Sequence, residues 1–392
     1  MRISMLLAVL ALPAVAYCGS NKLIVHEWGT FTALQDETGR SIGGINVNDE
    51  PLPVFVHRIG PGLVSDDNGG KGLPVGLPDV TMRLETPVIY FYPPGNSDKI
   101  PIVNVSATFN GGLLTEFYPK AQLTIDGKPT TKPVDRITES VRGGLTWNNV
   151  TIGTNDPKPV TNSHVWQSPR NVDSSPIEVG KEAEQYIFYR GCGHIDSPLK
   201  VIREGDRIHV VAASRLKWSP RWLAEFRADG TCAFERLVDP NLSCAYNPDP
   251  SSPGTFAESD FTADHVTDLR NEMRQALIAA GLYEKEADAM LETWKLSYFK
   301  SPGQRLFYLV PREWTDKVLP LSISKPCKLT RVMVGRIELI TPTQREAINQ
   351  IIAAGNAKPN FNVPARIASL GRFGYAMIQD ERARTSVRNA GK

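Results

Sequence analysis

An imidazole, a carboxylate and an indole stand at three consecutive positions near the start of the chain, at His26, Glu27 and Trp28. They lie in the run LIVHEWGTFT, whose β-branched and aromatic residues predict a strand. His26 is a candidate general base or metal ligand, and Trp28 is a candidate platform for a sugar ring or another flat group. The alternative is a core histidine bonded to the backbone beside a packed tryptophan.

The strand period decides which of these side chains can act together. Side chains alternate between the two faces of a strand, so His26 and Trp28 point one way and Glu27 the other. Gly29 can supply a β-bulge that interrupts this alternation. Without such a bulge, His26 and Glu27 cannot share one proton or one ligand.

Two further carboxylates stand in apolar strands. Glu85 lies in MRLETPVIYFY and Glu116 lies in GLLTEFYP, and in both runs the residues of both faces are apolar. A carboxylate in such surroundings must reach water, pair with a cation or hold a proton at raised pKa. A pair of desolvated carboxylates is what a glycoside hydrolase uses as acid and nucleophile.

Arginines in equally apolar strands offer the opposite interpretation of these acids. They are Arg190 in IFYRG, Arg305 in GQRLFYLVP and Arg336 in VMVGRIELI. Three such cations can pair with three acids and hold the sheet together without any catalytic role. In the hydrolase interpretation, Arg190 belongs to the catalytic group and Arg305 and Arg336 bind the substrate.

The sequence patterns that would indicate a metal site or a disulfide are weaker than those of the buried acids. His194 and Asp196 alternate in RGCGHID and would share one strand face, as metal ligands do, but no third ligand accompanies them. We therefore predict no cofactor and keep a metal at His26 or His194 as the alternative. Cys232 and Cys244 are the expected disulfide, since they close a short loop and export permits disulfides.

The first residues predict export. Arg2 precedes the apolar run ISMLLAVLAL, and Ala14-Val15-Ala16 has the small-x-small pattern of a signal-peptidase site. The run is shorter than the roughly 20 apolar residues that span a bilayer. We expect cleavage near Ala16 and no membrane span. The net charge of +2 gives no reason to expect a nucleic-acid partner.

Short β-branched and aromatic runs, separated by turn clusters, fill the chain to about residue 246. The period then changes to that of two amphipathic helices separated by Gly281. We therefore predict an α+β fold with a large antiparallel β-sandwich followed by a helical hairpin and a smaller mixed α/β segment. The predicted segments are 1–16 (signal peptide), 17–80 (N-terminal β segment), 81–246 (β-sandwich domain), 247–258 (linker) and 259–392 (C-terminal α+β segment).

Two local expectations concern the last third of the chain. Thr341-Pro342-Thr343-Gln344 is a capping box that predicts a helix ending at Gly355. The final strands are the candidate partners of LIVHEWGTF, which precedes the sandwich and needs a neighbouring strand.

The runs VHEWGTFT, LETPVIYFY, GGLLTEFYP and RVMVGRIELITP resemble an uncharacterised family of exported bacterial proteins. The resemblance extends over nearly all of the mature chain, and its motifs are long and occur in the same order. It implies export and a shared fold, and it carries no activity or catalytic residue.

Two functions follow from these observations. The first is a hydrolase of an extracytoplasmic polymer, with a glycan as the leading candidate, whose catalytic group is His26, Glu27, Glu85, Glu116 and Arg190. It requires these groups to converge in an open hollow. The alternative is a non-catalytic envelope or matrix protein that binds a ligand or partner, and acids paired with arginines in a closed core would favour it.

Overall fold

A computed structural model describes residues 22–47, 51–59, 69–70, 73–94, 101–129, 134, 136–212, 220–237, 252–357, 366–367 and 369–390. The predicted signal peptide with its cleavage site at Ala16, and Cys244, lie outside these residues.

Fifteen of the described strands form one large mixed sheet. At its centre β1 (Leu23–Gln35) lies between β5 (Met82–Tyr92) and β20 (Cys327–Leu339). Beyond β5 follow β12 (Ile187–Gly193), β7 (Gly112–Tyr118), β9 (Arg142–Ile152), β10 (Ile177–Val179) and β11 (Glu182–Glu184). Beyond β20 follow β18 (Gly303–Leu309), β15 (Arg221–Phe226) and β16 (Cys232–Leu237).

The remaining strands are short or lie off this path. Those that join the large sheet are β2 (His57–Arg58), β6 (Ile102–Asn110), β8 (Gln122–Ile125) and β19 (Leu321–Ile323). A separate three-stranded sheet contains β13 (Leu199–Glu204), β14 (Arg207–Ala212) and β17 (Ser252–Pro253). The last pair is β3 (Gly69–Gly70) with β4 (Leu73–Pro74).

β1 occupies the centre because its side chains are buried on both faces. Val25 belongs to the apolar cluster on one face and Trp28 to the cluster on the other. The pairing of β1 with β5 shifts register between Trp28 and Thr30, at Gly29, the residue that could supply a β-bulge. A Cβ on Gly29 would lie 3.0 Å from atoms of Pro87, so a larger residue would be crowded there.

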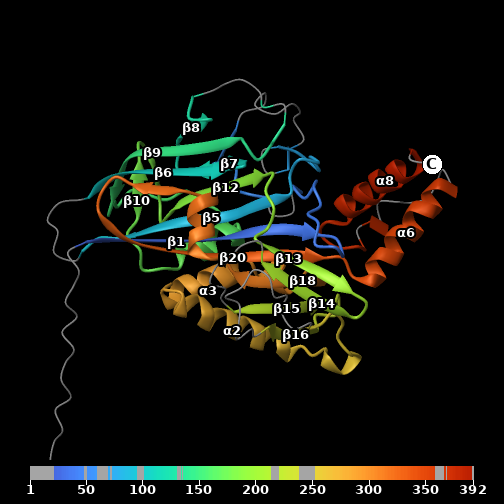
Figure 1. Cartoon of the computed structure of the whole chain (residues 1–392). Helices are drawn as coiled ribbons and strands as arrows, with labels where there is room; N and C mark the ends of the chain where they lie inside the picture. Colours follow the sequence, from blue (N-terminus) through green and yellow to red (C-terminus); the bar gives the residue numbers. More distant parts are fainter. Residues whose placement is uncertain are drawn as a thin grey trace, which may run out of the picture.

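Three helices cover the Trp28 face of the sheet: α2 (Asp264–Ala279), α3 (Glu284–Thr293) and α4 (Lys295–Phe299). Figure 1 shows α2 and α3 along one side of the sheet. The opposite face is covered by β6, β19 and α5 (Arg312–Val318), where Trp314 packs edge-on against Phe31. Shorter helices are α1 (His164–Gln167) and the 3₁₀ turns η1 (Ser168–Arg170) and η2 (Glu258–Asp260).

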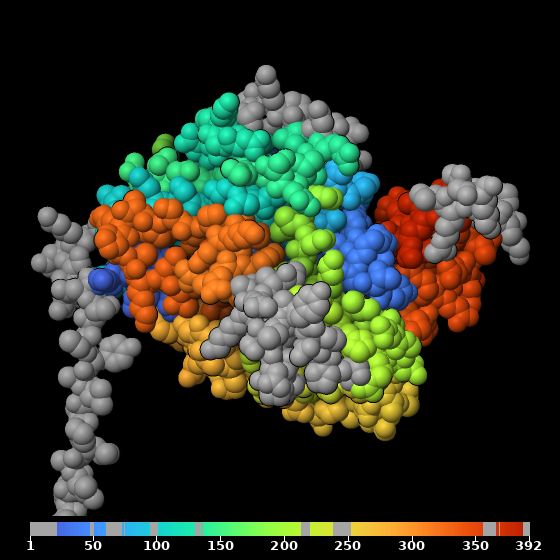
Figure 2. Space-filling model, viewed as in Figure 1, coloured from blue at the N-terminus to red at the C-terminus, as the bar shows by residue number. Residues whose placement is uncertain are grey.

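α6 (Pro342–Ala357) and α8 (Gly374–Ala390) pack at the end of the sheet where β1 and β20 finish (Figure 1). In the space-filling view these orange-to-red helices lie beside the blue N-terminal segment (Figure 2). The predicted capping box is confirmed: the N–H of Gln344 donates to Thr341 Oγ1 (3.2 Å), and the N–H of Thr341 donates to Gln344 Oε1 (3.0 Å).

The fold is therefore mixed α/β with one dominant sheet. β20 pairs with β1, which confirms the expected return of a final strand to the N-terminal one, but this pair is parallel whereas β1 and β5 are antiparallel. This parallel pair lies outside residues 81–246, for which the antiparallel sandwich was predicted. No helix within the described ranges is long and apolar enough to cross a membrane.

Candidate functional site

His26 meets an acid, but the acid comes from α3. Its Nδ1 lies 2.8 Å from Glu286 Oε2, and the exposed fractions of the two side chains are 4% and 0%. The hydroxyl of Tyr92 donates to Glu286 Oε1 (2.9 Å), and the N–H of Tyr283 donates to Oε2 (2.7 Å). The rings of both tyrosines contact the imidazole, so His26 is enclosed by protein.

Glu27 faces the other side of the sheet. Its carboxylate accepts hydrogen bonds from Arg331 Nε and from the hydroxyl of Tyr189. Arg331 in turn lies 2.7 Å from Asp316 on α5. Burial raises the pKa of Tyr189 well above its ordinary value, so this hydroxyl keeps its proton and remains a donor.

Glu85 is fully buried and ion-paired. Its Oε1 lies 2.7 Å from Arg83 Nη2 and 3.1 Å from Arg372 Nη2, and Thr32 Oγ1 donates to Oε2 at 3.1 Å. A carboxylate held between two guanidinium groups is stabilised in its charged form. The surroundings of Glu85 therefore match the interpretation in which arginines pair with the buried acids and hold the sheet together.

Glu116 is also buried and has two arginine neighbours. Its Oε1 lies 3.0 Å from Arg58 Nε, and its Oε2 lies 3.6 Å from Arg190 Nη1. Of the three strand arginines singled out in the sequence, Arg190 is the one that meets a predicted acid.

Arg305 and Arg336 meet an acid that the sequence did not single out, Glu338 on β20. Arg305 Nε lies 3.4 Å from Glu338 Oε2, and Arg336 Nε donates to Oε1 at 2.6 Å. Burial alone would raise the pKa of Glu338, but the two arginines outweigh it and hold that pKa below its ordinary value. Arg305 also donates to the carbonyl oxygens of Ser297 (2.7 Å) and Ser301 (2.6 Å).

The predicted substrate-binding role of Trp28, Arg305 and Arg336 needs correction. The exposed fraction of each of the three residues is 0%, so no ligand can stack on this indole or contact these guanidinium groups in this conformation. Tight packing of the Trp28 face against the helices, rather than ligand binding, explains why these large side chains are there.

The residues considered for a metal site and for a disulfide also have defined surroundings in the structure. His194 Nδ1 lies 2.7 Å from the carbonyl oxygen of Asp79. Among the described side chains, no group of three or more His, Cys, Asp or Glu residues could hold a metal ion. The expected disulfide is not seen, because Cys232 is a free buried thiol, and burial raises its pKa to about 12.

The predicted catalytic residues thus do not converge. His26 and Glu27 point to opposite faces of β1, Glu85 pairs with Arg83 and Arg372, and of the five predicted residues Glu116 and Arg190 alone meet each other. Each has its partner inside the protein, and the imidazole and the carboxylates are all at most 4% exposed. The interpretation of these acids as ion-paired parts of the fold describes the structure better than a shared hollow does.

A different region offers space for a ligand. A cleft of about 510 Å³ is lined by Asp206, Phe261 and segments 225–228, 254–256, 302–304, 341–344 and 369–371; we call it the α6 cleft because α6 begins in it. Its volume falls within the ~300–1,000 Å³ of small-molecule sites. Asp206, Thr255 and Thr343 are exposed at its rim.

Glu225 is the carboxyl group of this cleft with the most altered chemistry. Burial raises its pKa above the ordinary value, although Arg227 and a hydrogen bond from Gln304 oppose the shift. Gln304 Nε2 donates to Glu225 Oε2 at 3.1 Å, while Gln304 Oε1 accepts from Arg203, which fixes the orientation of the amide. A half-buried carboxyl with a raised pKa can hold a proton in mild acid and donate it to a ligand.

Apolar and cationic groups complete the wall opposite α6. Phe256 and Phe261 pack edge to face with their centroids 6.2 Å apart. The guanidinium of Arg227 lies 3.4 Å from the centroid of Phe261 and pairs with Glu258. Aromatic faces beside hydrogen-bonding side chains are a common arrangement in sites that bind sugar rings or other amphipathic groups.

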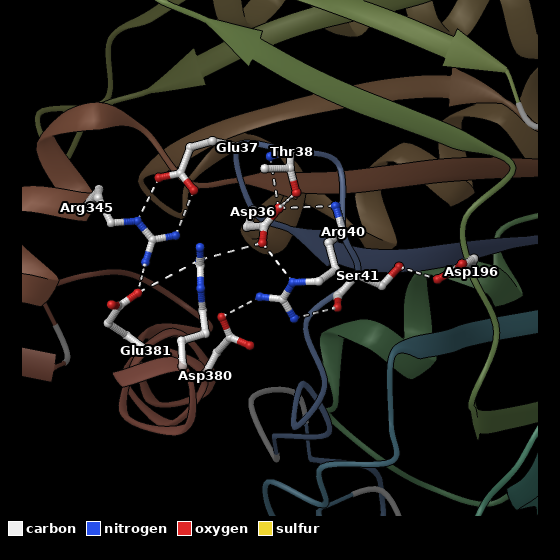
Figure 3. Close-up of polar contacts among 10 residues, drawn as sticks. Asp36, Glu37, Thr38, Arg40, Ser41, Asp196, Arg345, Asp380 and Glu381 are labelled. Atoms are coloured by element: carbon white, nitrogen blue, oxygen red, sulfur yellow. Dashed lines mark hydrogen bonds and ion pairs between the residues drawn. The ribbon is translucent and has the colours of Figure 1, made fainter. Parts of the chain in front are cut away.

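The α6 wall of the cleft is anchored to the end of β1 by ion pairs (Figure 3). Arg345 on α6 binds both oxygens of Glu37 (2.7 and 2.8 Å) and Glu381 on α8 (2.9 Å). Arg40 lies 2.7 Å from Asp380, also on α8. These contacts, together with the apolar cluster beneath them, hold α6 and α8 against the sheet.

No sequence pattern marks Glu225 as a site residue. It occurs in RWLAEF, a short strand like many others in the chain. Its raised pKa arises from burial, and the other segments that line the cleft, such as 254–256 and 369–371, are distant from it in sequence. Glu286 was missed for the same reason, since it lies 260 positions from His26.

Comparison with known proteins finds no family model that matches the chain and no curated protein sequence that matches it.

Proposed function

We propose that the protein binds a polymer outside the cytoplasm, with a glycan as the leading candidate, in the α6 cleft and without cleaving it. The observation that carries this proposal is the contrast between the acids predicted as catalytic, which are buried in ion pairs, and the cleft, which is lined by accessible polar and aromatic groups. Export, the resemblance to exported bacterial proteins, and the arrangement of residues 81–246 as a sandwich with a following helical hairpin are parts of the same proposal.

The lining of the cleft supports a sugar ligand. The hydroxyl side chains of Thr255 and Thr343 can exchange hydrogen bonds with ring hydroxyls, and Phe256 offers an apolar surface to a ring face. Sugars present the same combination of hydroxyl edges and C–H faces.

The test is binding of the purified full-length protein to a panel of insoluble and soluble glycans, with reducing-end release measured in the same samples. We expect retention on at least one glycan without release of new reducing ends. Phe256→Ala should weaken that binding about three- to ten-fold, because an aromatic contact contributes about 0.5–1.5 kcal/mol. Val160→Ala is the matched control, since Val160 is 96% exposed and does not line the cleft.

Binding to no glycan in the panel would reject the proposal. Equal binding by wild type and Phe256→Ala would reject the α6 cleft as the place of binding.

Hydrolysis at the same cleft is the second candidate, and the raised pKa of Glu225 favours it. Glu225 would give its proton to the oxygen of the departing sugar, and Asp206 at the rim is the candidate acceptor of a proton from the attacking water. Release of reducing ends that Glu225→Gln abolishes, and that Glu116→Gln does not, would establish hydrolysis and replace the binding proposal.

A further inference from the structure

From Asn104 onward, the outer face of β6 is polar and uncharged. Four apolar residues of this strand are buried, and the polar residues that alternate with them, from Asn104 to Asn110, are exposed or half-buried. β6 and β8 both pair with β9, so the three strands form one continuous layer. Figure 1 shows this layer on the side of the molecule away from α2 and α3. One face of the layer therefore packs on the core and the other faces solvent.

A hollow of about 330 Å³ lies on this outer face, and we call it the β9 hollow because Gly144 of β9 lies at its middle. Thr108 of β6 and Thr124 of β8 both pair with Gly144, so the three residues form one row across the layer. A Cβ built on Gly144 would lie 2.5 Å from Thr124 Oγ1 and 3.8 Å from Thr108 Oγ1. The missing side chain therefore leaves a space that both hydroxyls border, at the lower end of the ~300–1,000 Å³ of small-molecule sites.

The two threonine hydroxyls retain their hydrogen-bonding capacity. Among the residues that the structure describes, the side-chain hydroxyl of neither Thr108 nor Thr124 has a hydrogen-bond partner. In the adjacent row, by contrast, Ser106 Oγ lies 3.1 Å from Thr146 Oγ1, so these two hydroxyls bond to each other. A hydroxyl both donates and accepts. Because strands hold side chains more precisely than loops do, the hollow presents two pre-positioned hydroxyls to a ligand.

One cation and one anion also line the β9 hollow. Arg142 is exposed, and within the described part of the chain its guanidinium makes no ion pair or hydrogen bond, unlike the buried arginines of the central strands. The N–H of Arg142 donates to Asp126 Oδ1 (3.0 Å), and the N–H of Asp126 donates to the carbonyl oxygen of Arg142 (2.9 Å). This double contact fixes the turn after β8 against β9. The two charges cancel, so the lining favours a ligand without net charge.

From this geometry we propose that the β9 hollow is a second ligand site, which binds one unit of a neutral glycan through its hydroxyls. Neighbouring hydroxyls of a sugar ring match the lining, because the Asp126 carboxylate accepts from one while the Arg142 guanidinium donates to the next. The hydroxyls of Thr108 and Thr124 bond to the remaining ring oxygens. No described residue lines both this hollow and the α6 cleft. The inference thus goes beyond the proposed function and does not depend on the α6 cleft.

The test is isothermal titration of the purified full-length protein with neutral β-1,4-linked hexamers of glucose, mannose and galactose. The titrations use wild type and a Phe256→Ala background, in which binding at the α6 cleft is weakened. We expect the Phe256→Ala protein still to bind at least one of the hexamers. Adding Thr108→Val and Thr124→Val removes both hydroxyls without changing the side-chain shape, and should weaken this binding about ten-fold, because each hydroxyl loses a hydrogen bond.

Two further variants separate the hollow from its surroundings. Arg142→Gln removes the guanidinium at an exposed position and should weaken the same binding about five-fold, because hydrogen bonds from a charged donor are the stronger ones. Thr151→Val makes the matched change elsewhere on β9, outside the hollow, and should leave the affinity unchanged. Valine is favoured in strands, so the threonine variants should fold as their parent does, which thermal unfolding checks.

Unchanged binding after Thr108→Val and Thr124→Val would overturn the β9 hollow as a site. Binding by wild type that disappears in the Phe256→Ala background would also overturn it, and would leave the α6 cleft as the place of binding. Equal losses from Thr151→Val and from the pair of threonine substitutions would overturn the placement of the sugar over Gly144. Binding of no hexamer to wild type would overturn the second site, whereas the proposed function is rejected only by the wider glycan panel.

Discussion

The centre of the sheet and the α6 cleft contain the same kinds of side chain, but these differ in burial and in ion pairing. Around β1, glutamates and a histidine are buried, and each lies within hydrogen-bond or ion-pair distance of a side chain from another element. In the cleft, Glu225 and Asp206 retain access to solvent, and no ion pair is described for either carboxylate. The same residue types therefore have different functions in the two regions.

This contrast bears on how a charged residue in an apolar strand is interpreted. Leaving a buried ion without its partner costs several kcal/mol, so a buried carboxylate in a stable fold is a sign of a partner before it is a sign of catalysis. Chemistry needs a group that a ligand can reach. Substitutions in each region should therefore separate loss of stability from loss of binding.

Glu85→Ala should cause the largest loss of stability, about 3–5 kcal/mol in the free energy of unfolding, because Arg83 and Arg372 lose the carboxylate between them. Urea denaturation followed by fluorescence measures it. Glu204→Ala is the control, with a side chain 71% exposed, and should change stability by less than about 0.5 kcal/mol. A Glu85→Ala protein as stable as wild type but inactive would place Glu85 in a site.

His26→Ala should cost about 1–3 kcal/mol, since it leaves a cavity and removes one buried partner of Glu286, while Tyr92 and Tyr283 still bind that carboxylate. The same denaturation experiment measures it. Glycan binding by the refolded variant should match wild type. Selective loss of binding, with stability retained, would mean that His26 acts on the ligand and that the division between the two regions is wrong.

The ion pairs that hold α6 should make stability depend on pH. Burial raises the pKa of Glu37 but Arg345 outweighs it, so the folded pKa lies below the ordinary value of 4.5. A group with a lowered folded pKa stabilises the fold above its unfolded pKa, and that stabilisation is lost as the pH falls through the folded value. Arg345→Gln should therefore lose about 1 kcal/mol at pH 7 and show a weaker fall in stability below pH 4.5 than wild type does. If the stability of the two proteins falls equally as the pH is lowered, the Glu37–Arg345 ion pair is not the source of the pH dependence.

Glu225→Gln should have the smallest effect on folding, within about 0.5 kcal/mol of wild type at pH 7. Burial disfavours the charged carboxylate of Glu225, so a neutral amide costs nothing in stability there. Glu235→Gln is the matched control, because burial raises the pKa of Glu235 too but it does not line the cleft. We expect ligand affinity or turnover to change in Glu225→Gln alone; an identical change in both variants would remove Glu225 from the site.

Much of the local structure could be predicted from the sequence. The strand at 23–35, the bulge at Gly29, the amphipathic helices on either side of Gly281 and the capping box at Thr341 all follow from rules that act over a few residues. The candidate site could not be predicted, because Glu225, Gln304 and the start of α6 meet only when strands and helices far apart in the chain are packed.

Local sequence patterns predict where strands and helices form and that several acids and arginines are buried together, since periodicity and the cost of burying charge act on short runs. The partner of each buried charge depends on the packing of distant strands and helices. Glu286 contacts His26, and Glu338 contacts Arg305, because the chain folds back on itself. No local sequence pattern encodes these contacts. Pairing across a sheet depends on strand order and register, and a polar residue becomes a site only where that packing leaves room beside it.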